Sequence, residues 1–314
     1  MVRVAVAGAI NWDINLFVDR FAKVGEEVAV RRITRVPGGK AANVAVAASR
    51  VLGPNQVGLI GCLGEDAIAA RQMEILKDEG VDTSAVMIVE GEESGQAYII
   101  IDEQGRNVIN THFGANMMLS PKALLATNCL NIIKRSPILT VIDPPIDTIK
   151  AITEMGRRHQ KMMVWDAGVR AALGLRALED IVRNIDYIIL NEVELSNLTK
   201  RKEPMDAREA LSQINEGIKL VVKLGARGCV MVTEGDVIEA SGIDLKRLGM
   251  AVVNTVGCGD AFLGVFLASK AEGLSDREAL MRANVAGASK ATRPETRGSP
   301  TRAELERWLE RLGM

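Results

Sequence analysis

The chain has 314 residues, 47% of them hydrophobic and only 3% aromatic, and its 39 basic and 40 acidic side chains give a net charge of −1. This balance argues against nucleic acid or a membrane as an obligate partner, and no run of about 18 apolar residues could span a bilayer. The four cysteines are far apart, which favours reduced thiols over disulfides or a zinc site. We therefore expect a cytoplasmic protein with a large aliphatic core.

The first elements place two polar side chains directly after a short strand. Residues 2–7 alternate as a strand that ends at Gly8, and Asn11 and Asp13 follow it. Ligands of open α/β sheets bind beyond the carboxyl ends of the strands. These side chains are therefore candidates for holding sugar hydroxyls, with simple turn formation as the alternative.

A glycine-rich segment, Pro-Gly-Gly-Lys-Ala-Ala-Asn at 37–43, then leads into a helix rich in Ala and Val. Lys40 and Asn43 lie one turn apart on the same face of that helix. The spacing differs from that of the G-x-x-x-x-G-K-[ST] phosphate loop, so that motif is excluded.

Two extended regions, 13–36 and 94–113, interrupt a chain that otherwise alternates between strands and helices. The second contains a hairpin signal, because 96–101 and 107–113 flank the turn Asp-Glu-Gln-Gly. We expect the two regions to pair as a small sheet outside the main one. Ile99, Ile101 and Ile109 are expected to form an exposed apolar face on it.

From about residue 120 the alternation is regular, and it predicts strands at 138–142, 162–165, 187–190, 220–223 and 229–232. Several of these apolar strands end in polar residues. Continuous apolar strands with polar ends fit a parallel sheet that is buried on both faces and carries its site along one edge. The candidate ligands at these strand ends are Asp143, Asp166, Asn191 with Glu194, and Lys223 before Gly225.

The segment 252–262, Val-Val-Asn-Thr-Val-Gly-Cys-Gly-Asp-Ala-Phe, is the most informative in the chain. It places Gly257, Cys258 and Gly259 at a helix N-terminus, where free N–H groups and the helix dipole favour an anion. Asp260 falls in the first helical turn. A carboxylate there suits a general base in phosphoryl transfer, while a helix-capping role is the alternative.

Together these segments resemble the PfkB family of carbohydrate kinases, within it the ribokinases. The match is collinear over nearly the whole chain. It rests on the motifs G-A-I-N-W-D (8–13), P-G-G-K-A-A-N (37–43), G-A-N (114–116), N-E-V-E (191–194), K-L-G-A-R-G (223–228), N-T-V-G-C-G-D-A-F (254–262) and P-T-R-A-E-L-E (300–306).

The resemblance implies a three-layer α/β/α core with a mostly parallel sheet (1–12, 37–93 and 114–314) and a small β-sheet lid (13–36 and 94–113) that serves as a homodimer contact. It implies transfer of the γ-phosphate of ATP, with Mg²⁺, to a hydroxyl of ribose or a closely related ribosyl compound. Nucleosides, ribose 1-phosphate and ADP as donor stay open as alternatives, as does a non-catalytic sugar- or nucleotide-binding member of the family.

The resemblance also implies roles for individual residues. Asp260 matches the base, and the amides of Gly257, Cys258 and Gly259 match an anion hole. Glu194 matches a residue that positions magnesium indirectly. The residues that match sugar contacts are Asn11, Asp13, Gly38, Gly39, Lys40, Asn43 and Asp143. Those that match nucleotide contacts are Asn191, Lys223, Gly225, Gly228 and Asn284.

One departure from the family pattern concerns a monovalent cation. Ribokinases hold potassium beside the anion hole, and the Asp that opens their motif is replaced here by the neutral Asn254. Arg293 and Arg297 lie in the neighbouring loop, and Arg297 is a candidate for the missing positive charge. We therefore predict that turnover changes less than about threefold when sodium replaces potassium.

Overall fold

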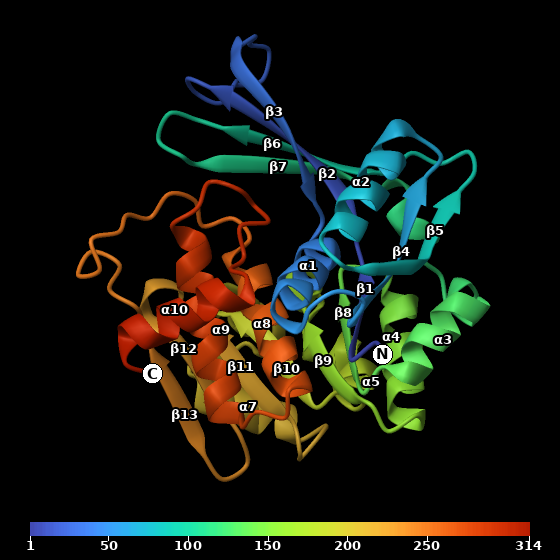
Figure 1. Cartoon of the computed structure of the whole chain (residues 1–314), viewed down its shortest axis with the longest axis vertical. Coiled ribbons are helices and arrows are strands. Elements are labelled where there is room, and N and C mark those ends of the chain that lie inside the picture. The colour runs from blue at the N-terminus through green and yellow to red at the C-terminus, as the bar shows by residue number, and fades with distance from the viewer.

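A computed structural model describes all 314 residues, Met1–Met314. It consists of an α/β body and a second, smaller sheet that projects from it (Figure 1). The large sheet has nine strands in the order β13-β12-β11-β10-β9-β8-β1-β4-β5. Their bounds are β1 Val4–Gly8, β4 Val57–Gly64, β5 Asp82–Val89, β8 Ile138–Ile142, β9 Met162–Asp166, β10 Tyr187–Asn191, β11 Lys219–Lys223, β12 Gly228–Val232 and β13 Val237–Ser241.

Most of this sheet is parallel, and only β12 and β13 run antiparallel to their neighbours. The central strands β1, β4 and β8 are buried along their whole length, as continuous apolar runs predict. The five strands predicted after residue 120 are confirmed. The edge strands β5 and β13 lie outside the predicted set, because their residues alternate between buried and exposed and give a weaker apolar signal.

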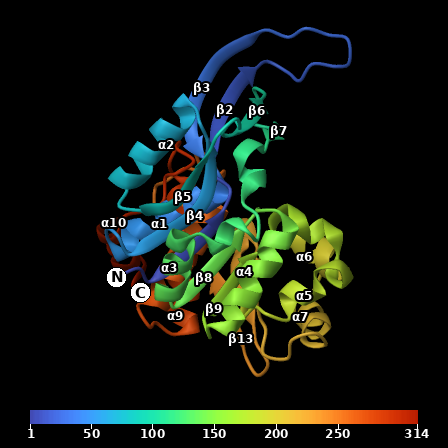
Figure 2. The same ribbon diagram turned by 90° about the vertical axis from the view of Figure 1, so that its right-hand side faces the viewer.

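Helices cover both faces of the large sheet and divide the core in two, which confirms the three-layer prediction (Figure 2). On one face lie α1 (Lys40–Leu52), α2 (Ala67–Asp78), α8 (Cys258–Ala271), α9 (Asp276–Ala291) and α10 (Arg302–Leu312). On the other lie α3 (Thr127–Arg135), α4 (Ile146–Arg158), α5 (Glu179–Val182), α6 (Glu192–Thr199) and α7 (Pro204–Ser212). No helix combines the length and the apolar character needed to cross a membrane.

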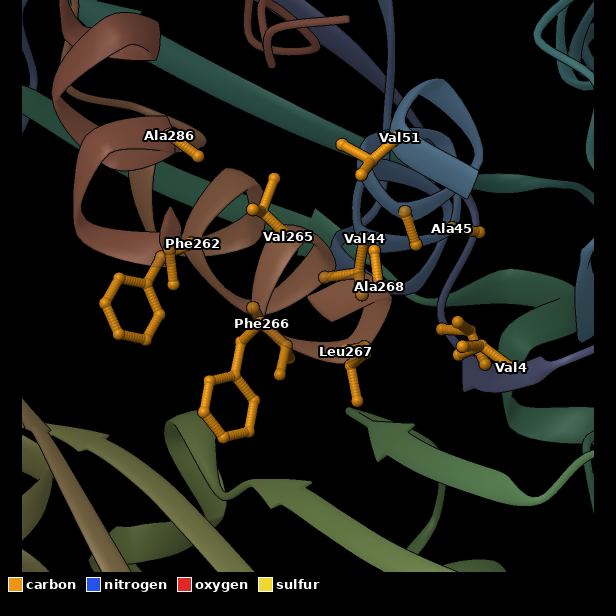
Figure 3. Close-up of a cluster of buried hydrophobic side chains, with 14 of the residues drawn as sticks. Val4, Val44, Ala45, Val51, Phe262, Val265, Phe266, Leu267, Ala268 and Ala286 are labelled. Carbon is orange, nitrogen blue, oxygen red and sulfur yellow. The ribbon is translucent and has the colours of Figure 1, made fainter. Parts of the chain in front are cut away.

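The contact between α1 and α8 sets the geometry of the site, and Figure 3 shows the aliphatic and aromatic side chains that fill the core beneath it. Gly264 on α8 allows the close approach, because a Cβ there would lie 2.4 Å from the Cβ of Ala47 on α1. One turn earlier on each helix, Asn43 contacts Asp260. The two helices therefore run side by side in the same direction, with their N-termini together.

The small sheet has four strands in the order β3-β2-β6-β7, with β2 and β6 parallel. The bounds are β2 Asn11–Val18, β3 Val30–Gly38, β6 Gly95–Ile101 and β7 Asn107–His112. The strands of the 13–36 region extend beyond the predicted limits, since β2 begins at Asn11 and β3 continues to Gly38. Both extensions carry candidate sugar contacts, so these residues lie where the small sheet joins the body.

One expectation for the small sheet is wrong. Ile109 is 53% exposed, as predicted, but Ile99 is only 5% exposed. The two residues are direct partners across β6 and β7 and so share a face. Ile99 lies on β6 on the same face of the sheet as the buried Ala97 and Asp13, whereas Ile109 lies on the edge strand β7.

Candidate active site

Two glycine turns start the helices that meet at the site. Gly39 has φ +87° and precedes α1, and a Cβ there would lie 2.4 Å from the Asn11 nitrogen. Gly257 has φ +86° and precedes α8, and a Cβ there would lie 2.2 Å from the Thr296 carbonyl oxygen. Only glycine fits these positions without strain. The turns bring the first residues of both helices to one point.

Asp260 is a half-buried carboxylate at this point. Its Oδ2 accepts a hydrogen bond from Asn43 Nδ2 at 2.8 Å. Burial raises the pKa of Asp260, and the Asn43 hydrogen bond and the charge of Lys40 partly oppose that rise. A desolvated carboxylate that is held in one orientation suits the work of a proton acceptor.

The turn before Asp260 presents backbone N–H groups, although one of them is already engaged. The Cys258 N–H donates to the Thr255 carbonyl at 3.2 Å. Gly259 lies close to a positive charge, since a Cβ there would be 3.4 Å from Lys223 Nζ. The start of α8 therefore combines helix-terminal amides with a neighbouring ammonium, an arrangement that favours an anion.

Charged side chains from the ends of three strands surround this point. Lys40 Nζ lies 3.1 Å from Asp143 Oδ2 at the end of β8, and Lys223 Nζ at the end of β11 lies 2.9 Å from Asp166 Oδ2 at the end of β9. Burial opposes the charge on Lys40, but Asp143, Asp166 and Asp260 together raise its pKa. These are the carboxyl ends of parallel strands, where the sequence predicted the site.

On the small-sheet side, Asp13 and Asn11 face the same region. Asp13 is 6% exposed, and burial raises its pKa to about 6, a rise that Arg297 opposes and Asp260 strengthens. Gly38 is needed beside it, because a Cβ there would lie 2.1 Å from Asp13 Oδ1. Asn11 Oδ1 accepts from Asn116 Nδ2 at 2.9 Å, so its orientation is fixed by the body.

The residues predicted to bind nucleotide lie around β10 to β13. Asn191 and Glu194 form a capping box at the start of α6, in which each side chain accepts from the other's backbone N–H. Burial and, to a smaller extent, the charge of Asp166 raise the pKa of Glu194, while Lys223 opposes that rise. Gly225 and Gly228 have positive φ in the turn before β12. Asn284 on α9 donates to the Ser241 carbonyl at 2.8 Å.

A family comparison decides the identity of this arrangement. The description "pfkB family carbohydrate kinase" matches residues 1–303. The chain belongs to the PfkB family. It is an ATP-dependent carbohydrate kinase, as its sequence motifs predicted.

The individual relatives of similar sequence or structure include a ribose-1-phosphate kinase and ribokinases. The kinase is 29% identical over 301 residues to an ATP-dependent ribose-1-phosphate kinase from Halopiger xanaduensis, with 96% of each chain covered. It superimposes on the structure of Arabidopsis thaliana ribokinase complexed with ribose and ATP with a TM-score of 0.87, at 26% identity over 99% of each chain. A ribokinase from Thermotoga maritima gives a TM-score of 0.86 at 26% identity, over 99% of this chain and 100% of the other.

Two cations of the kinase lie in places that the sequence did not reveal. Arg297 makes no hydrogen bond to Asn254, and its role as the missing charge stays a prediction. Its guanidinium is buried under the Gly38 loop, where it donates to the Gly38 carbonyl at 2.7 Å and to Asn43 Oδ1 at 2.8 Å. The cation that contacts Asn254 is Lys290, whose Nζ donates to the Asn254 carbonyl at 2.9 Å.

Asn116 and Asp166 are further site residues that sequence reasoning left without a role. Asn116 lies in the G-A-N motif, and its buried side chain makes four hydrogen bonds, two of them to Ile10 and one to Phe113. Asp166 stood among the strand-end ligands. Only the structure shows that it pairs with Lys223 within reach of the catalytic region.

Proposed function

We propose that this kinase transfers the γ-phosphate of ATP to a hydroxyl of ribose or a closely related ribosyl compound, with Asp260 as the general base. The observation that carries the proposal is the Asp260 carboxylate itself. It is half-buried, held by Asn43, and placed in the first turn of a helix that begins at a glycine turn. The printed names of the relatives, ribokinase and ribose-1-phosphate kinase, supply the acceptor class.

In this proposal Asp260 accepts the proton of the acceptor hydroxyl as the hydroxyl oxygen attacks the γ-phosphorus, and the bond from that phosphorus to the β–γ bridging oxygen breaks so that ADP leaves. The amides of Gly257, Cys258 and Gly259 bind the transferring phosphoryl group. The Cys258 amide exchanges its bond to Thr255 for one to the phosphate. Donors that are fixed before the reaction stabilise the developing negative charge without reorganisation at the moment of transfer.

We assign acceptor binding to the region where the small sheet meets the start of α1. Hydroxyl groups need both donors and acceptors, and the side chains of this region supply carboxylates, amides and an ammonium. The small sheet acts as a lid, and its closure excludes water that would compete as acceptor. The residues assigned are Asn11, Asp13, Gly38, Gly39, Lys40, Asn43 and Asp143.

The nucleotide is assigned to the surface formed by Asn191, Lys223, Gly225, Gly228 and Asn284. Oxygen donors there fit Mg²⁺, because Glu194 and Asp166 place two carboxylates close together. We propose that they hold the ion through water. Bound with ATP, magnesium neutralises charge on the phosphates.

The test is a coupled assay of nucleotide turnover with ribose, ribose 1-phosphate and nucleosides as acceptors, and with ATP and ADP as donors. Asp260→Asn should lower kcat about 10²–10⁴-fold with the best pair while acceptor binding changes little. Asp236→Asn, in an exposed turn, is the matched control and should retain wild-type kcat. Retention of a tenth of the wild-type kcat in Asp260→Asn would refute the assignment of the base.

We further propose that the kinase is a cytoplasmic homodimer joined through its lid. Ile33 and Val108 are exposed on one face of the small sheet, where they align across the strands through Leu16 and Ile100, which gives this face an apolar surface that a second copy would cover. The four cysteines carry no disulfide, in keeping with a reducing compartment. Sedimentation at micromolar concentration should give a dimer, and Val108→Lys should give a monomer. A wild-type monomer contradicts the proposal.

A further inference from the structure

Lys290 is a buried cation without an acidic partner. It is the penultimate residue of α9 and is 0% exposed. Its Nζ donates to the carbonyl oxygens of Asn254 at 2.9 Å and Arg293 at 3.3 Å. No carboxylate lies within ion-pair distance of it, although lysines are almost never fully buried unless paired. The charge is therefore solvated by backbone oxygens, as a bound metal ion would be.

The two carbonyls belong to the two loops that build the anion site. Asn254 opens the loop that ends in the Gly257 turn. Arg293 opens the loop whose Thr296 carbonyl packs against Gly257. A hydrogen bond from Asn254 Nδ2 to the Pro294 carbonyl at 2.8 Å joins the same loops. Lys290 therefore fastens together the backbone on both sides of the glycine turn.

The ammonium also lies near the reacting groups. It is close enough to Asp260 for the two charges to interact, and burial lowers the pKa of Lys290 while Glu295 on the neighbouring loop opposes that change. A hydrophobic residue would fill the same volume without the desolvation cost of a buried charge. A structural role alone leaves that cost unexplained.

We propose, resting on the proposed function above, that Lys290 is a built-in cation that positions the Gly257–Gly259 turn and adds fixed positive charge beside the transferring phosphate. Backbone carbonyls alone can bind potassium in other proteins, and an ammonium is a compact charge with three donors. Lys290 therefore occupies the place of a free monovalent ion. Turnover is independent of potassium for that reason, and the neutral Asn254 side chain is compatible with it.

Two variants of Lys290 separate the effect of its charge from the effect of its packing. Lys290→Ala removes the charge and leaves a space among carbonyl oxygens that an ion can enter. Lys290→Met removes the charge and fills the space. Each is compared with wild type in choline chloride, potassium chloride and ammonium chloride at constant ionic strength. Wild-type kcat should change less than threefold among these salts. In choline, the kcat of Lys290→Ala should be at least tenfold below that of wild type, and potassium or ammonium should raise it at least threefold. The kcat of Lys290→Met should stay low in all three salts.

A second readout does not depend on the acceptor. Potassium that binds in the vacated space stabilises the folded state by mass action, so it should raise the Tm of Lys290→Ala relative to choline. The Tm of wild type and of Lys290→Met should not respond in this way. If wild type phosphorylates none of the acceptors, the proposed function fails, and this difference in Tm still decides the role of Lys290.

Several results would overturn the proposal. A tenfold activation of wild type by potassium would show that a free ion is still required. Wild-type kcat in choline for either variant would show that the charge is dispensable. Loss of activity in Lys290→Ala with no cation response in kcat or Tm would reduce Lys290 to a packing residue. If Lys290→Ala does not fold, the kcat of Lys290→Met and the wild-type titration decide the question.

Discussion

Asp13 is a carboxylate that the proposed sugar site uses in its ionised form and that folding prefers neutral. It is 6% exposed and packed against the Gly38 backbone. Burial raises its pKa from the ordinary 3.8 to about 6, even though Arg297 is near enough to lower it. We therefore expect Asp13→Asn, which keeps the shape and removes the charge, to stabilise the protein while it damages the site.

The size of this stability difference follows from the pKa values of Asp13 in the folded and unfolded states. Between about pH 4 and pH 6 the folded state binds more protons at Asp13 than the unfolded state, so stability falls as the pH rises through this window. A difference of about two in pKa corresponds to about 3 kcal/mol. Asp13→Asn should thus be about 3 kcal/mol more stable than wild type at pH 7.5, roughly 5 °C in Tm for a chain of this size. Below pH 4 the difference should vanish.

The assay is thermal unfolding of wild type and Asp13→Asn at pH 4.0, 5.0, 6.0 and 7.5, with the exposed Asp236→Asn as a control that shows no such trend. Kinetics accompany it. Acceptor KM should rise for Asp13→Asn, and wild-type KM should rise as the pH falls below about 6. An Asp13→Asn variant equal to or less stable than wild type at pH 7.5 would refute the reasoning, because it would mean that Arg297 fully compensates the buried charge.

Three further predictions concern the turn, the lid junction and the metal. Gly257→Ala should lower kcat at least tenfold, because Gly257 has φ +86° and the added Cβ would lie 2.2 Å from the Thr296 oxygen, so the turn would have to distort. An unchanged kcat would argue against an anion site at this turn. Asn116→Ala should cost about 3 kcal/mol by leaving buried partners on Ile10 and Asn11 unpaired, measured as a fall in Tm, and a fall below 1 °C contradicts this. A chelator should stop turnover yet leave the Tm of the nucleotide-free protein unchanged, since no cluster of three metal-binding side chains is present; a clear fall in Tm would reveal a resident ion.

Local motifs made the main parts of the site predictable. Glycines at turns and polar residues at strand ends mark Gly39, Gly257 and Asp143 without any knowledge of distant contacts. The large sheet followed from the same logic, because buried strands carry a continuous apolar signal. The edge strands β5 and β13 were not predicted from this signal, since their residues alternate between buried and exposed.

Arg297 and Lys290 could not be placed from sequence. Both lie in a charged stretch that is typical of a solvated surface, yet both are buried. The partners of Arg297 include Asn43, 254 positions away, and the partners of Lys290 are carbonyl groups, which carry no residue signature. Side chains that bind backbone across the fold leave no spacing pattern for a sequence to display.

The side-by-side packing of α1 and α8 determines at which point of protein synthesis the site can form. The hydrogen bond between Asn43 and Asp260 joins positions 217 residues apart, and the Gly264–Ala47 contact that aligns the helices spans the same distance in the chain. A nascent chain therefore holds half a catalytic centre until α8 has left the ribosome. Shortened translation products that end before α8 lack both Asp260 and the Gly257 turn, so they hold most of the assigned nucleotide residues without the proposed base or anion site.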